Sequence, residues 1–70
     1  MEEIEITGEY IQLNQLLKTL NWVENGGEAN DVIDQGLVKV NGETELRKRN
    51  KIYNEFVIEF NGQKAKVIIK

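Results

Sequence analysis

The spacing of apolar residues changes at Gly36, and this change restricts the fold to helices followed by a sheet. Before Gly36, apolar residues recur every three or four positions, which predicts two helices over about 13–20 and 28–35. After Gly36 they alternate with polar residues, as in half-buried strands. Gly36 itself is the predicted left-handed end of the second helix. The inward residues are Leu13, Leu16, Leu17 and Leu20 in the first helix and Ala29, Val32 and Ile33 in the second.

Two Asn-Gly pairs divide the second half of the chain into hairpins. Asn-Gly favours a two-residue hairpin turn, because both residues readily take the positive φ that such a turn needs. Asn41-Gly42 therefore predicts a hairpin of strands at 38–40 and 43–45, and Asn61-Gly62 a hairpin whose second strand is 64–69. In the second hairpin, Phe56, Ile58 and Phe60 alternate on one face of the first strand, and Ala65, Val67 and Ile69 share a face of the second.

Two shorter segments complete the prediction. Residues 3–6 alternate Glu and Ile, which predicts a short first strand, and residues 52–55 are interpreted as a turn. The predicted class is α+β: a short N-terminal strand and two short helices packed on a small antiparallel β-sheet. Residues 1–70 are expected to form a single domain, because a chain of 70 residues buries only roughly 60% of its surface and has one thin core.

The residue types present argue against an enzyme. Cysteine, histidine and serine are all absent, which excludes thiolate nucleophiles, Cys/His zinc sites and serine triads. Asp31 and Asp34 could be imagined as a metal pair, but one turn apart on a polar helix face they are better interpreted as solvated. We therefore expect no catalytic residue, no metal and no cofactor.

Charge is unevenly distributed along the chain. The net charge is −3, yet residues 1–34 carry eight acids and one base, whereas residues 35–70 carry eight bases and four acids. Four bases fall within five positions: Arg47, Lys48, Arg49 and Lys51. A local basic cluster attracts phosphate whatever the overall charge. The alternative interpretation is a solvated segment that maintains solubility and protects a sheet edge.

A second candidate binding site precedes the second predicted helix. In Asn25-Gly26-Gly27, backbone N–H groups at a helix start could bind an anion, and glycine allows a phosphate to approach closely. The alternative is an ordinary tight turn between helices. The carboxylate of Glu28 would also compete with an arriving phosphate.

Together, these motifs resemble those of a known family. A leucine-rich helix, Gly27-Glu28-Ala29 at the start of a second helix, and the string Gly-x-Val-x-Val-Asn-Gly at 36–42 are similar to the alpha-L RNA-binding motif, found in the domain named after the fourth protein of the small ribosomal subunit. The continuation through 43–52 resembles the single-domain YbcJ/YaaA-like subgroup. Many members carry Ser/Thr-Arg where this chain has Gly26-Gly27, and a Gly-Asp turn where it has Asn54-Glu55.

The resemblance implies a non-enzymatic bacterial module that binds structured RNA. The expected RNA is ribosomal RNA, a ribosome precursor or a tRNA-like molecule, and ribosomal particles are further possible partners. The alternative is a protein-interaction adaptor that docks an acidic partner through the same basic patch. The acidic N-terminus differs from a signal peptide, so we expect a cytoplasmic monomer with no membrane partner. Carried over by position, the RNA-binding residues are Lys18, Gly26, Gly27, Lys39, Asn41, Arg47, Lys48, Arg49 and Lys51.

Overall fold

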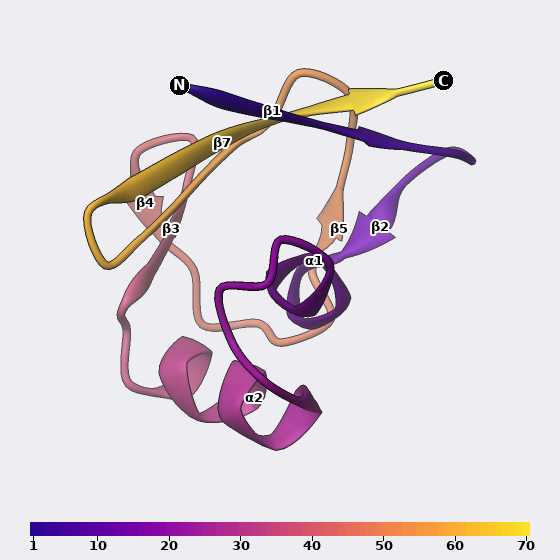
Figure 1. Ribbon diagram of the computed structural model, residues 1–70. Coiled ribbons are helices and arrows are strands. Elements are labelled where there is room, and N and C mark those ends of the chain that lie inside the picture. Colours follow the sequence, from indigo (N-terminus) through magenta and orange to yellow (C-terminus); the bar gives the residue numbers. More distant parts are fainter.

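Helix α1, Leu13–Thr19, is the element around which the protein is built. The computed structural model describes residues 1–70 (Figure 1). Leu13, Leu16 and Leu17 are fully buried, as their spacing predicts. Just beyond the helix, Asn21 has a φ of 64°, which lets the N–H of Trp22 donate to the Leu17 carbonyl at 3.1 Å.

Helix α2, Gly26–Asp34, begins two residues before the predicted start. The side chain of Asn25 explains the difference: its Oδ1 accepts the N–H of Glu28 at 2.8 Å, so Asn25 caps the first turn. The predicted end at Gly36 is confirmed. Its φ is 75°, and the N–H of Leu37 donates to the Val32 carbonyl at 3.1 Å.

A five-stranded sheet lies against the helices (Figure 1). Its order is β1 (Glu2–Ile6), β7 (Gln63–Ile69), β6 (Val57–Phe60), β3 (Val38–Val40) and β4 (Glu43–Thr44). Four strands pair antiparallel as expected, whereas β1 runs parallel to β7 with Ile4 opposite Val67. The predicted α+β class is confirmed, and the parallel pair joins the two ends of the described chain.

Both predicted Asn-Gly hairpins are present. Asn41 and Gly42 have φ values of 52° and 86°, and Asn61 and Gly62 have values of 53° and 79°. These values are those of the tight turn that matches the twist of paired strands.

The predicted turn at 52–55 is wrong at its first residue. Ile52 is fully buried and belongs to β5 (Lys51–Ile52), which pairs antiparallel with β2 (Ile11–Gln12). A two-residue strand offers one inward residue and therefore no periodicity to recognise. The turn itself covers Asn54 and Glu55.

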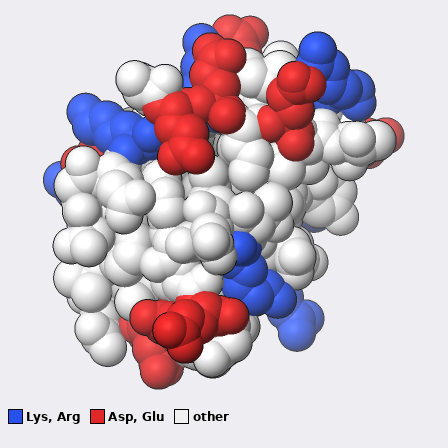
Figure 2. Space-filling view, in the orientation of Figure 1, with Lys and Arg blue, Asp and Glu red and all other residues white.

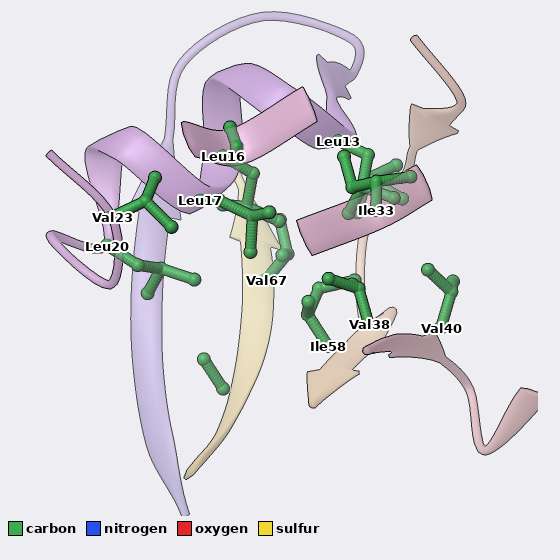
Figure 3. Packing of buried hydrophobic residues seen from close by; sticks show 13 residues of the cluster. Leu13, Leu16, Leu17, Leu20, Val23, Ile33, Val38, Val40, Ile58 and Val67 are labelled. Carbon is green, nitrogen blue, oxygen red and sulfur yellow. The ribbon is translucent and has the colours of Figure 1, made fainter. Parts of the chain in front are cut away.

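The core is entirely apolar. Thirteen residues are buried and none is polar, so the helices meet the sheet through dispersion and hydrophobic contact alone. Figure 3 shows Leu16 and Leu17 of α1 directed toward Val67 of β7, Leu13 beside Ile33 of α2, and Val38 beside Ile58. Neither helix has the length and apolar character that crossing a membrane would require.

Candidate nucleic-acid interface

The basic segment, residues 47–51, is attached to the start of α1. The N–H of Leu13 donates to the Asn50 carbonyl at 2.9 Å, and the N–H of Asn14 donates to the Lys48 carbonyl at 3.0 Å. First-turn N–H groups have no partner within their own helix, so these carbonyls satisfy them. The backbone that carries the cations is therefore fixed by the fold.

Arg47 is held by a neighbouring carboxylate. Its Nε donates to Glu45 Oε2 at 2.9 Å and its Nη2 to Glu45 Oε1 at 3.1 Å, while the amide of Asn50 donates to the same carboxylate at 3.2 Å. The hydrogen bond from Arg47 lowers the pKa of Glu45, and the same bond raises the pKa of Arg47. The Arg47 side chain is nevertheless 76% exposed, so Glu45 orients it without hiding it.

Beside these cations lies an open hollow of about 510 Å³. It is lined by the following five residues: Arg47, Arg49, Asn50, Lys51 and Tyr53. Three of the four predicted cations of the basic segment thus share one surface. The fourth, Lys48, instead forms an ion pair with Asp34 at the end of α2, with Nζ 3.1 Å from Oδ2.

Lys18 and the glycine pair form a second group. Lys18 lies in the last turn of α1, and its Nζ is 3.8 Å from the point that a Cβ on Gly26 would occupy. The carboxylate of Glu28 reaches back to the start of α2, where it accepts the N–H of Glu24 at 2.7 Å. Because a seven-residue helix is about 10 Å long, this group lies about that far from the basic segment, at the other end of α1.

Lys39 and Asn41 belong neither to the residues that line the hollow nor to the group of Lys18 and the glycine pair. Lys39 is exposed on β3, opposite Glu59 of β6 and Thr44 of β4. Asn41 is occupied by the fold: its Oδ1 accepts the N–H of Val57 at 2.9 Å, and its own N–H donates to the Val57 carbonyl at 2.8 Å. The side-chain oxygen of Asn41 therefore has a structural partner.

Two exposed aromatic residues at the hollow are not among the predicted site residues. Tyr53 lines it, and the Tyr10 ring lies 5.9 Å from the Tyr53 ring. Strand alternation would have identified Tyr53, because burying Ile52 turns Lys51 and Tyr53 outward. The interpretation of 52–55 as a turn concealed that alternation.

Comparison with known proteins identifies the fold and the family. The S4 domain model matches residues 4–68, and the chain therefore belongs to the S4 domain family. It is 39% identical over 59 residues to YbcJ of Escherichia coli, covering 84% of each chain, and equally to YbcJ of Shigella flexneri.

Solved structures agree with this assignment. The solution structure of Escherichia coli YbcJ, described as revealing an alpha-L motif involved in RNA binding, superposes with a TM-score of 0.74 at 35% identity, covering 97% of this chain and 87% of that one. Ribosomal protein S4e of the 30S subunit from Thermoplasma acidophilum gives a TM-score of 0.68 at 29% identity, over 81% of this chain and 30% of that one. The predicted resemblance to the alpha-L family is confirmed.

Proposed function

We propose that this protein is a non-enzymatic module that binds structured RNA through the basic segment and the adjoining helix ends. The observation that carries the proposal is the attachment of residues 47–51 to the start of α1, which presents cations on a fixed backbone. Ordering flexible groups opposes binding, and a segment already ordered avoids much of that cost. The RNA-binding description of the YbcJ structure supports the same function.

Several cations are available to phosphate. Arg49, Lys51 and Lys18 form no ion pair within the chain. Arginine offers a planar fork that matches phosphate oxygens, and lysine a mobile point charge. In the first turn of α2, the N–H groups of Gly26 and Gly27 lack intrahelical partners and point in the direction that favours an anion. A phosphate there would lie beside Lys18 and away from the hollow.

The positions of the acidic residues favour one orientation of bound RNA. In Figure 2, acidic atoms gather at the top of the view, where β1 lies, and at the bottom over α2, and basic atoms lie beside them in both places. The three glutamates of β1 are exposed. These carboxylates repel an RNA that approaches from the β1 side, so they favour the orientation in which the basic segment meets phosphate.

The proposed target is ribosomal RNA, a ribosome precursor or a tRNA-like molecule, bound by a monomer in the cytoplasm. The likeness to a 30S ribosomal protein supports a ribosomal target. Folded RNA displays closely spaced phosphates around helices, junctions and loops, and shape-based recognition of such features is common among RNA-binding domains.

The test is crosslinking in cells followed by sequencing of the RNA that co-purifies with the protein. We expect enrichment of folded ribosomal or transfer RNA, and recovery of no RNA above background would contradict the proposal. A competition experiment separates RNA binding from docking of an acidic protein. Folded RNA should displace a labelled RNA far better than polyglutamate of equal charge, whereas equal displacement would favour the adaptor function.

A further inference from the structure

Tyr53 is exposed yet held in place. Tyr53 is 44% exposed. The centroid of its ring lies 5.9 Å from the ring centroid of Tyr10 and 5.9 Å from that of Phe56. The Phe56 contact is edge-to-face at 68°, a favourable arrangement for aromatic pairs. The core contains thirteen buried residues and no tyrosine. Tyr53 is therefore fixed without being part of the core.

Tyr10 fixes a cation beside this ring. The Nζ of Lys51 lies 4.9 Å from the centroid of the Tyr10 ring, within the range of a cation–π interaction. One face of Tyr10 is thus occupied by the ammonium. Tyr53, by contrast, lines the hollow together with Arg47, Arg49 and Lys51. The Tyr53 ring and three cations therefore line the same open hollow.

We propose that Tyr53 stacks with an unpaired nucleobase of the bound RNA, while Arg47, Arg49 and Lys51 bind the phosphates on either side of that nucleotide. Tyr10 is a positioning residue that holds the Tyr53 ring and the Lys51 ammonium. The inference rests on the proposed function and adds the feature recognised: a bulged or looped-out nucleotide next to a helix.

The residues that line the hollow are chemically suited to bind a nucleotide. A nucleobase offers a π-face to the tyrosine, and its flanking phosphates offer anions to the cations that line the same hollow. A hollow of about 510 Å³ lies within the 300–1,000 Å³ range of small-molecule pockets. It has room for a single extruded nucleotide. Base–aromatic stacking is tolerant of sequence, so the site selects an unpaired position and not a particular base.

The test compares two RNA hairpins that differ by one bulged nucleotide, with 2-aminopurine in the bulge as a fluorescent reporter of stacking. The variants are Tyr53→Leu, which removes the π-face, and Tyr53→Phe, which retains it, with folding checked by thermal melting. Tyr53→Leu should bind the bulged hairpin about fivefold to a hundredfold more weakly and the paired hairpin equally well. Tyr53→Phe should bind both like the unaltered protein, and the unaltered protein should quench 2-aminopurine.

The outcomes separate this inference from the proposed function. If the unaltered protein binds neither hairpin nor other folded RNA, the proposed function itself fails. If it binds both hairpins equally, leaves 2-aminopurine unquenched and is unaffected by Tyr53→Leu, RNA binding holds and the nucleotide site is refuted. If Tyr53→Leu does not fold, quenching by the unaltered protein decides between these results.

Discussion

The carboxylate of Asp34 lies 3.1 Å from the ammonium of Lys48, which joins the last residue of α2 to the basic segment. A carboxylate at the C-terminal end of a helix is opposed by the helix dipole, and Lys48 offsets that repulsion. Asp31, one turn earlier, forms no ion pair. The two aspartates of α2 are therefore not equivalent, although the sequence presents them as one acidic face.

Asp34→Asn should strengthen RNA binding slightly, and Asp31→Asn should leave it unchanged. Both changes remove one negative charge, but only the first frees Lys48 for phosphate. An exposed ion pair contributes up to about 1 kcal/mol, so the gain should be at most about fivefold. Fluorescence anisotropy with a folded RNA measures both affinities. An equal gain in the two variants would show that Lys48 is already available to RNA.

Changing Arg47, Lys48 and Arg49 together to glutamate should abolish most RNA binding without unfolding the protein. All three are exposed, and exposed substitutions shift stability by about 0.5 kcal/mol each. A carboxylate at position 47 beside Glu45 adds some repulsion. We expect at least a hundredfold weaker binding, roughly 2.7 kcal/mol at about 1.4 kcal/mol per decade, measured by anisotropy with circular dichroism as the check on folding.

The chain offers a matched control for this variant. Lys64, Lys66 and Lys70 lie in or beside β7 and do not line the hollow. Changing these three to glutamate shifts the net charge by the same −6, because each +1 becomes −1. We expect a much smaller loss of affinity. Equal losses in the two triple variants would mean that overall charge, and not the basic segment, determines binding.

The salt dependence of RNA affinity should report how many basic groups contact phosphates. With four to six basic groups on phosphate, log K should fall against log salt with a slope of roughly −0.7 to −0.9 per contact. Affinity for a folded ribosomal RNA fragment should exceed that for poly-U, which lacks fixed phosphate geometry. Equal affinity for both, with a shallow slope, would contradict recognition of structured RNA.

Gly42→Val should destabilise the protein through its backbone alone. The φ of Gly42 is 86°, and a Cβ there would meet nothing within 4 Å, so steric contact adds no cost. A β-branched residue at positive φ is strained by about 1–3 kcal/mol. Urea unfolding measures the difference. Gly42→Asn should cost less, because asparagine tolerates positive φ, and an unchanged stability in the valine variant would contradict this account of the turn.

The Glu45–Arg47 pair should make stability depend on pH at the acid end. The Arg47 hydrogen bond lowers the pKa of Glu45 from its ordinary value of 4.5. A depressed carboxyl pKa contributes stability above the unfolded pKa and loses it as the pH falls through the folded one. The unfolding free-energy difference between the parent and Glu45→Gln should therefore be constant near neutral pH and shrink below about pH 4.5. A difference that persists in strong acid would contradict this.

The sequence predicts most of the fold because its signals are local. Leucine spacing locates α1, and Asn41-Gly42 and Asn61-Gly62 locate both hairpins, since each signal lies within the element that it specifies. The β2–β5 pair and the parallel β1–β7 pair lack such signals. Two-residue strands show no periodicity, and Glu3–Ile6 alternates in the same way whichever direction its partner runs.

The candidate site is only partly predictable for the same reason. The basic cluster is contiguous, so the sequence reveals it. Its attachment to Leu13, the diversion of Lys48 to Asp34 and the meeting of Tyr10 with Tyr53 all join residues distant in the chain. Asn41 shows the reverse case: the family resemblance assigns it to RNA, whereas in the structure its side-chain oxygen accepts the N–H of Val57.

The parallel pairing of β1 with β7 also determines when this fold can be completed. β1 has β7 as its only neighbour in the sheet, so the first strand waits until residues 63–69 have been synthesised. Pairing between strands that are distant in the sequence slows folding. The chain between them must first be brought together at a cost in entropy, and only then do the contacts between the strands stabilise the fold. During translation, Ile4 and Ile6 therefore lack their partner strand until Val67 and Ile69 have left the ribosome.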